Sequence, residues 1–449
     1  MNDDTIAAIS TPFGEGAIAL LRLSGARAIE IADKIFRSKK KAAELTPRAQ
    51  QFGKIVCENE TLDDVMLTVF RAPASYTGED VVEISCHGGI LITRRILQLL
   101  LENGARLAEP GEFTQRAFLN GKMDLTQAEA VMDLIRAQTD LALRAAAEQL
   151  EGRLGHRVSD IREKILALLA HVEAYIDFPD EDIDPQTGDA LLKNLDDARE
   201  KIAQLLRTAD QGKILREGLR TVIYGAPNVG KSSLLNVLLG CERAIVSELP
   251  GTTRDTIEEV INLRGIPLRL IDTAGVRESA DVIEKAGIER TLKQIENADL
   301  VLHVVDGSAP SNRVLVFAKE ETRRPELLIL NKRDLGEHES WRDISDAVRI
   351  SCRTGEGIDE LARAIFDHVM RGGARLENSS VAINARHQTC LKNAAQFLDA
   401  ARQAMCDGLS PEFVAIELRA SLDAVGEVVG KADAEELLGK IFSTFCIGK

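Results

Sequence analysis

Residues 225–233 read GAPNVGKSS and match the pattern G-x-x-x-x-G-K-[ST], whose chemistry is the binding of nucleotide phosphates. Gly225 and Gly230 let the backbone turn its N–H groups toward phosphate oxygens. Lys231 is placed to reach the β- and γ-phosphates, and the Ser232 hydroxyl is placed to ligate Mg²⁺. We therefore predict a nucleotide-binding loop made of Asn228, Val229, Gly230, Lys231, Ser232 and Ser233.

Two further segments carry groups suited to the γ-phosphate and the magnesium ion. The turn Asp272-Thr273-Ala274-Gly275 follows the apolar run LRLI, so its aspartate can hold the magnesium shell while its last N–H contacts the γ-phosphate. Residues 247–255 read SELPGTTRD, and Thr253 is a natural second magnesium ligand on a loop that orders when the γ-phosphate is present. The alternative for this loop is an ordinary polar connection.

The base is read by two motifs farther along the chain. Asn331-Lys332-Arg333-Asp334 follows an apolar run, and the Asp334 carboxylate can accept hydrogens from guanine N1 and its 2-amino group. Adenine lacks that amino group, so its binding would leave buried polar atoms unsatisfied. Ser351-Cys352-Arg353 can offer backbone N–H groups to the guanine oxygen. Together with the phosphate loop, these motifs predict a GTPase.

The elements that must position these groups form a doubly wound parallel sheet. Between residues 219 and about 370, apolar runs such as 219–224 and 326–330 alternate with helical periods, as in Ras-like P-loop domains. Helical periodicity lies on both sides of this stretch, which indicates one helical domain interrupted by an inserted nucleotide domain.

The predicted fold class is therefore a multidomain α/β protein. Residues before 119 mix strand-like and helical runs and predict a small α+β domain. The expected domains are an N-terminal α+β domain at 1–118, a discontinuous helical domain at 119–216 and 377–449, and a GTPase domain at 217–376.

Composition limits the class of protein. With 449 residues, 45% hydrophobic and 28% charged, the chain predicts a soluble protein of several domains, with no run of about 18 apolar residues and no signal-peptide layout. Seven cysteines without a CxxC pair are typical of the cytoplasm and argue against a zinc site. A net charge of −15 and 4% aromatic residues disfavour non-specific nucleic-acid binding, although they do not exclude a local basic patch.

The usual water-positioning group is missing. In Ras-type GTPases a glutamine follows the Asp-x-x-Gly turn and orients the attacking water, whereas Val276 stands there and has no polar atom. No arginine finger is evident by spacing, and such a finger is worth about three to five decades in rate. The residues alone leave two interpretations: an inactive nucleotide switch, or an enzyme whose catalytic group lies elsewhere.

Several motifs carry a family resemblance. GAPNVGKSSLLN, PGTTRD, DTAGVRE and NKRD resemble the GTPases that include Era, EngA and MnmE. LLRLSG, YTGEDVVEISCHGG, PGEFTQRAFLNGKMDLTQAEAVMDLI, DFPDEDI and the last five residues, FCIGK, narrow the resemblance to the MnmE (TrmE) family of tRNA-modification GTPases. The resemblance spans the whole chain, and FCIGK is its most distinctive part.

For the nucleotide site, the resemblance implies an active enzyme. Glu284 would position the attacking water, and a potassium ion held where two nucleotide domains meet would supply the charge of the missing finger. Its ligands would be the Asn228 side-chain oxygen and backbone oxygens near Ser247 and Leu249 and at Thr252. Judged from the residues alone, a solvated carboxylate at a helix start is the favoured interpretation of Glu284. Asn228 is as readily a turn residue of the phosphate loop as a ligand.

For the N-terminal domain, the resemblance implies dimerisation and binding of 5-formyltetrahydrofolate through Arg22, Glu79, Lys122 and Lys449. Arg22 and the lysines can pair with carboxylates of the glutamate tail, and Glu79 can accept hydrogens from the amino-pteridine edge. Judged from the residues alone, each is a surface charge. Cys446 is compatible both with a functional thiol and with a small buried hydrophobe.

The activity implied is potassium-dependent GTP hydrolysis coupled to tRNA modification. A homodimer would work with the flavoprotein MnmG (GidA), which holds FAD and NADH, in a heterotetramer or larger assembly. Together they would add an aminomethyl or carboxymethylaminomethyl group to the 5-position of the wobble uridine, with the folate as one-carbon donor. A ribosome-assembly GTPase of the Era or EngA type is the alternative, and it predicts a basic RNA-binding domain or tandem nucleotide domains. A dynamin-like membrane enzyme, the second alternative, predicts a lipid-contacting tip.

Overall fold

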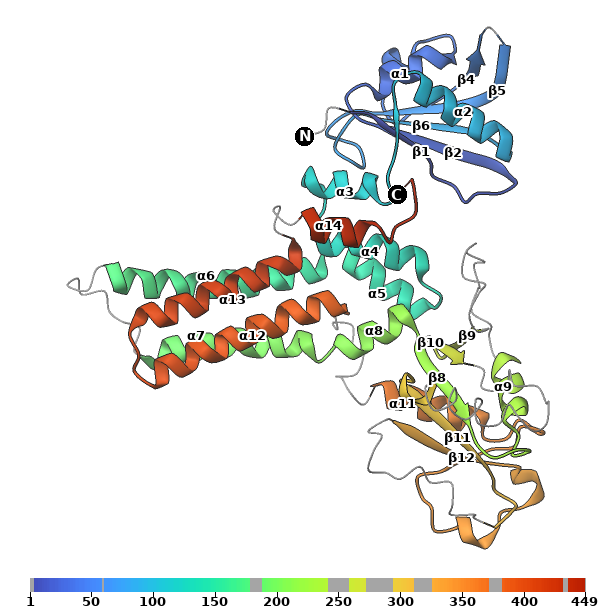
Figure 1. The fold of residues 1–449 in the computed structure, drawn as a ribbon, viewed down its shortest axis with the longest axis vertical. Helices are drawn as coiled ribbons and strands as arrows, with labels where there is room; N and C mark the ends of the chain where they lie inside the picture. Colours follow the sequence, from blue (N-terminus) through green and yellow to red (C-terminus); the bar gives the residue numbers. More distant parts are fainter. Residues whose placement is uncertain are drawn as a thin grey trace, which may run out of the picture. The chain divides into compact units, whose positions relative to one another are not determined.

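The computed structural model describes residues 4–58, 60–177, 188–240, 258–271, 294–310, 325–370, 382–430 and 435–448 (Figure 1). The chain divides into two compact units, and each is described by itself. The first combines Met1–Met132 with Gly426–Lys449, and the second is Asp133–Val425.

The first unit is built on a seven-stranded sheet with the order β3-β4-β5-β6-β2-β1-β7, antiparallel except for the β1–β7 pair. Helices α1 and α2 bury their apolar faces on one side of it, against residues such as Leu21, Leu23 and Ile84. The bounds are β1 Ile6–Ile9, β2 Gly16–Ser24, α1 Ala28–Ile35, β3 Phe36–Arg37, β4 Gln50–Cys57, β5 Glu60–Phe70, β6 Val81–Gly88, α2 Ile90–Glu102 and β7 Arg106–Leu107, with a 3₁₀ turn at Ala42–Glu44.

Strand alternation gives this sheet a second, polar face. Along β2, Leu21 and Leu23 are fully buried in the core, so the intervening Arg22 points to the opposite side. There α3 (Glu112–Leu119) places Phe113 in a small separate apolar cluster with Ile6 and Ala8.

Two helices and the C-terminal tail complete this unit. The apolar side of α4 (Leu125–Arg136) contributes Leu125 and Met132 to a cluster with Phe442 of α14 (Glu435–Phe442). In the tail, Ile447 forms an isolated antiparallel β-bridge with Pro110.

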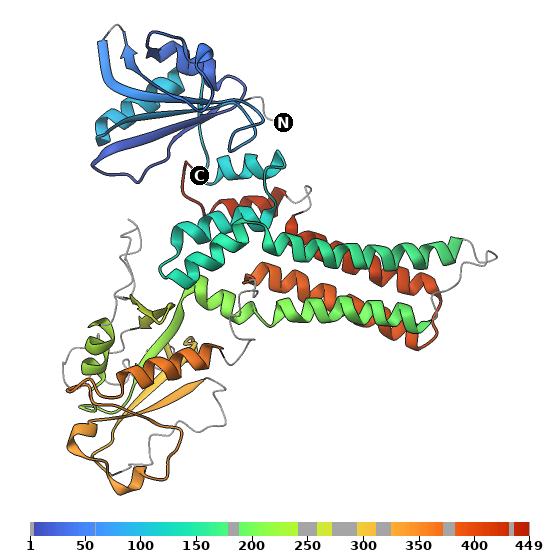
Figure 2. The ribbon, with the colours of Figure 1, turned by 180° about the vertical axis from the view of Figure 1, so that it is seen from behind.

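The second unit contains a group of long helices, and both views show α6, α7, α12 and α13 side by side (Figures 1 and 2). In α6 the buried residues follow the helical period, as at Leu154, Val158, Ile161 and Ile165, so one stripe faces its neighbours. The helix bounds are α5 Asp140–Leu150, α6 Arg153–Asp177, α7 Gly188–Leu206, α8 Ala209–Glu217, α12 Ala385–Cys406 and α13 Pro411–Val429.

A six-stranded sheet lies between α8 and α12 in sequence, with the order β13-β12-β11-β8-β10-β9. All neighbours are parallel except β9 and β10, and the predicted strand 219–224 is confirmed as β8. The predicted multidomain α/β fold class is confirmed. The bounds are β8 Leu219–Tyr224, α9 Lys231–Gly240, β9 Glu258–Leu263, β10 Ile266–Ile271, β11 Leu300–Asp306, β12 Glu326–Asn331, β13 Val348–Arg349 and α11 Ile358–Met370, with 3₁₀ turns at Arg333–Leu335 and Glu339–Trp341.

Among the residues that the structure describes, no helix has the length and apolarity needed to cross a bilayer.

Candidate functional sites

The phosphate loop joins β8 to α9 and depends on its two glycines. Gly225 has φ +154°, and a Cβ there would lie 2.1 Å from the Val304 carbonyl oxygen. Gly230 has φ +102°, and a Cβ there would lie 2.2 Å from the Asn331 amide nitrogen. Asn228 itself adopts φ 62°, a conformation that asparagine tolerates better than most residues.

The ammonium group of Lys231 is hydrogen-bonded to the backbone of the phosphate loop. Lys231 begins α9, and its Nζ donates a 2.8 Å hydrogen bond to the Ala226 carbonyl. Burial lowers the pKa of Lys231, since the ammonium is partly removed from water. Asn228, Ser232 and Ser233 are exposed, whereas Val229 is buried. A nucleotide phosphate would replace the carbonyl as partner of a lysine already at the helix N-terminus, where anions are favoured.

The base-reading motif is tied directly to the phosphate loop. Asn331, only 3% exposed, donates from Nδ2 to the Val229 carbonyl at 2.9 Å and accepts the Cys352 N–H at Oδ1 at 3.1 Å. Three motifs separated in sequence therefore meet at one side chain. Because the Cys352 N–H is engaged in this way, binding a guanine oxygen would require it to be shared between two acceptors.

Asp334, the predicted guanine acceptor, is oriented by its neighbours. Its Oδ1 accepts the Ser351 hydroxyl at 2.7 Å, and the Arg353 guanidinium lies 3.9 Å from its Oδ2. The carboxylate retains acceptor sites, since each oxygen can take two hydrogen bonds. Burial raises the pKa of the Cys352 thiol to about 11, so this thiol is neutral at physiological pH.

Sequence reasoning missed Asp306, which supports the same site. Lys332 has φ 67°, and its Nζ lies 2.7 Å from Asp306 Oδ2, while the other oxygen accepts from the Ser308 amide and hydroxyl. The available signal was an aspartate ending a buried parallel strand, because β11 pairs with the strand that carries the base motif.

Several predicted residues lie outside the described residues: Ser247, Leu249, Thr252, Thr253, Asp272, Thr273, Ala274, Gly275, Glu284 and Lys449.

On the N-terminal sheet, Arg22 is paired across two strands. It lies opposite Glu83, and its Nε and Nη2 donate to Glu83 Oε1 at 2.9 and 2.7 Å. Its guanidinium also lies 5.5 Å from the centre of the Tyr76 ring and 5.8 Å from that of Phe113. Among the described residues Nη1 has no hydrogen-bond acceptor, so this edge of the cation can receive a ligand.

The structure brings Glu79 and Lys122 to the same segment, residues 73–80. Lys122 Nζ donates to the Pro73 carbonyl at 3.0 Å, and its stem lies beside Gly78. Glu79 accepts from the Ser24 hydroxyl at 2.7 Å, and Ser24 follows Arg22 on the same face of β2. Three of the four residues expected to bind folate therefore converge around one loop.

A cluster of charges that the sequence analysis did not identify lies beneath this loop. Arg116 contacts Asp4, Glu79 and Glu112, and Arg106 contacts Asp4 and Glu112. Burial alone would raise the pKa of Glu112, but hydrogen bonds from Arg106, the Glu109 amide and Arg116 outweigh it, and the pKa lies below its usual value.

Cys446 lies in the C-terminal tail, which is held along its backbone. The Gly111 N–H donates to the Cys446 carbonyl at 3.4 Å, and the Ser10 hydroxyl donates to the Gly448 carbonyl at 3.1 Å. The Cys446 side chain is exposed, and its role stays a prediction.

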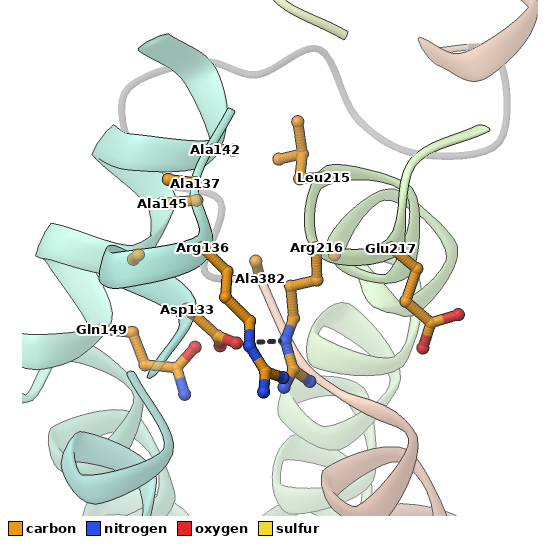
Figure 3. Close-up of a pocket in the computed structure, with 12 residues that line it drawn as sticks. Asp133, Arg136, Ala137, Ala142, Ala145, Gln149, Leu215, Arg216, Glu217 and Ala382 are labelled. Atoms are coloured by element: carbon orange, nitrogen blue, oxygen red, sulfur yellow. Dashed lines mark hydrogen bonds and ion pairs between the residues drawn. The ribbon is translucent and has the colours of Figure 1, made fainter. Parts of the chain in front are cut away.

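Within the second unit, a cavity of about 190 Å³ lies between the last turn of α4, from Asp133 onward, and helices α5 and α8 (Figure 3). Arg136 and Arg216 lie beside Asp133, and Arg216 Nε donates to Asp133 at 2.8 Å, whereas the Glu217 carboxylate points away from them (Figure 3). It contains none of the predicted site residues.

The parallel sheet, the glycine-dependent phosphate loop and the joined base motif define a P-loop GTPase. Residues 125–446 match the family profile described as the MnmE helical domain, and residues 5–122 match that of the GTP-binding protein TrmE N-terminus. The chain belongs to the MnmE family.

Full-length relatives agree with this assignment. The chain is 53% identical to the tRNA modification GTPase MnmE of Akkermansia muciniphila, covering 99% of each chain. It is 47% identical to the protein of that name from Alkaliphilus metalliredigens, covering 100% of this chain and 99% of the relative. Among solved structures, a variant of Aquifex aeolicus Era bound to GDP.AlF4⁻ shares 26% identity over 39% of this chain and 65% of that one, with a TM-score of 0.27.

Proposed function

We propose that this chain is a potassium-dependent GTPase that acts in tRNA modification. The observation that carries the proposal is the Asn331 side chain, which joins the phosphate loop to the guanine motif inside a chain of the MnmE family. With a flavoprotein partner it installs the aminomethyl or carboxymethylaminomethyl group at the 5-position of the wobble uridine, using a folate one-carbon unit.

In the GTP step, Asp334 accepts the guanine hydrogens and Ser351 holds that carboxylate in place. Lys231 exchanges the Ala226 carbonyl for phosphate oxygens. The exposed Ser232 hydroxyl at the start of α9 fits a magnesium ligand, together with Thr253 and the shell held by Asp272. Bound Mg²⁺ neutralises charge on the phosphates. Glu284 orients the attacking water.

The monovalent-cation site uses Asn228 together with backbone oxygens near Ser247 and Leu249 and at Thr252. Asn228 fits this role because its side chain is exposed at a left-handed turn beside the phosphate positions. Potassium supplies positive charge to the transition state in place of an arginine finger.

The folate site is formed by Arg22, Glu79 and Lys122 with Lys449. The unengaged Nη1 edge of Arg22 and the exposed ammonium of Lys122 fit the carboxylates of the glutamate tail. Glu79 keeps about a quarter of its side chain exposed, which fits an acceptor for the pteridine edge.

The proposed assembly is a homodimer that binds the flavoprotein MnmG and tRNA in the cytoplasm. Exposed apolar side chains on the first unit support the dimer: Ile18 is 69% exposed, Leu91 is 75% exposed, and Phe13 lies under Arg94, one helical turn from Leu91. Because an acidic chain with a net charge of −15 is repelled by tRNA phosphates, the partner would provide most of the affinity for tRNA. The domain bounds proposed for this assembly are 1–118, 119–216 with 377–449, and 217–376.

The test is nucleoside analysis of tRNA from a deletion strain, with and without the wild-type chain restored. Loss of the 5-substituted wobble uridines, reversed by the wild-type chain, supports the proposal. Unchanged nucleosides with defective ribosome assembly would instead favour a GTPase of the Era or EngA type.

A further inference from the structure

Glu79 is held by two donors from different parts of the first unit. The Ser24 hydroxyl donates to Oε2 at 2.7 Å, and Arg116 Nη1 lies 3.3 and 3.2 Å from Oε1 and Oε2. Ser24 is fully buried and Arg116 is 8% exposed. The carboxylate is thus anchored from below while part of it faces solvent.

The serine contact has a fixed direction. Ser24 Oγ lies 2.6 Å from Thr77 Oγ1, and a carboxylate can only accept. The Ser24 hydroxyl must therefore donate its single hydrogen to the Glu79 carboxylate, and the Thr77 hydroxyl must donate to Ser24 Oγ. The Glu79 N–H in turn donates to Thr77 Oγ1 at 3.2 Å, so the chain of hydrogen bonds begins and ends at Glu79.

Arg116 has no hydrogen left on either Nη for a ligand. Nη1 also donates to the Asp4 carbonyl oxygen at 3.1 Å, and Nη2 donates to Asp4 Oδ1 at 2.7 Å and to Glu112 Oε1 at 2.9 Å. All four Nη hydrogens are thus committed to the protein. Arg22 differs, because its Nη1 edge has no acceptor among the described residues.

We propose that Arg116 is a positioning residue for folate binding, fixing the Glu79 carboxylate through its guanidinium while Asp4 and Glu112 fix Arg116. This inference rests on the proposed folate site and extends it to a residue that does not touch the ligand. Without the guanidinium, Glu79 would face the negative charges of Asp4 and Glu112 and would turn away from the pteridine edge.

The test measures the dissociation constant of 5-formyltetrahydrofolate by calorimetry on the full-length chain. Arg116→Gln weakens binding by about 10-fold or more, the scale of one charge-assisted hydrogen bond. In the Glu79→Gln background the same change has no further effect, because Arg116 acts only through Glu79. A residue that merely supports the fold would weaken binding in both backgrounds.

Arg106→Gln is the matched control. Arg106 pairs with Asp4 and Glu112 in the same cluster but does not contact Glu79, so its loss leaves the dissociation constant within about twofold. If Arg116→Gln does not fold, Arg116→Lys and Ser24→Ala take its place, and each weakens binding only when Glu79 is present.

Wild-type affinity in Arg116→Gln, or equal losses in both backgrounds, overturns the inference while the folate site stands. Absence of binding by the wild-type chain overturns the folate assignment, and this inference with it.

Discussion

The amide nitrogen of Asn331 lies 2.9 Å from the Val229 carbonyl oxygen, so the end of β12 is fastened to the middle of the phosphate loop. The amide oxygen of the same side chain accepts the Cys352 N–H. Asn331 therefore connects the parts of the site, and both of these contacts form without a ligand. Pre-formed contacts of this kind lower the ordering cost of binding.

Replacing Asn331 with alanine should weaken GTP binding by at least about 10-fold. The change leaves the buried Val229 carbonyl and the Cys352 N–H without partners, at about 1–3 kcal/mol for each such group. Titration with a fluorescent guanine nucleotide measures the effect. Asn103→Ala is the control, because it removes a similar 2.8 Å bond to the Leu99 carbonyl in the first unit. Unchanged GTP affinity in Asn331→Ala would contradict a role of Asn331 in holding the phosphate loop for nucleotide binding.

Potassium dependence should reside in the Asn228 side chain. Asn228→Gly removes the side-chain oxygen, and glycine adopts φ 62° without strain. GTP affinity should persist, whereas faster hydrolysis in potassium than in sodium should disappear. Hydrolysis rates in the two chlorides at matched ionic strength provide the measurement, and Asn228→Asp, which keeps an oxygen, is the control. Equal rates for the wild-type chain in both salts would refute the cation site.

Glu284 should govern turnover without governing affinity. Glu284→Ala removes the group expected to orient water, so GTP should bind normally while single-turnover hydrolysis falls by about two decades or more. Glu289→Ala, in the same segment of sequence, should retain the wild-type rate. If Glu284→Ala hydrolyses GTP at the wild-type rate, Glu284 does not position the attacking water and is a solvated carboxylate.

The strand that leads into the phosphate loop could be predicted from the sequence, whereas the charge pairs of the N-terminal domain could not, for a physical reason. The phosphate loop is local: its glycines, lysine and flanking strand lie within a few residues, and the strand appears as predicted at 219–224. The Arg22–Glu83 pair depends on the register of β2 against β6, and the Arg116–Asp4 pair joins residues 112 positions apart. Neither register nor long-range pairing leaves a periodic signal, so these charges looked like ordinary surface residues.

Alkaline pH should destabilise the first unit through Cys86. This residue of β6 is 3% exposed, and burial, assisted by the charge of Asp63, raises the pKa of its thiol from 9.0 to about 11. The unfolded chain therefore loses this proton first, and stability falls as pH rises from about 9 to about 11.

Relative to Cys86→Ala, the wild-type chain should lose up to about 3 kcal/mol over that window, at 1.36 kcal/mol per pKa unit. Urea unfolding at pH 8 and at pH 11, followed by signals from the first unit, measures the difference between the two proteins. The exposed Cys406 provides the control, since Cys406→Ala should keep the wild-type slope. Parallel pH profiles for wild type and Cys86→Ala would mean that the buried thiol does not control alkaline stability.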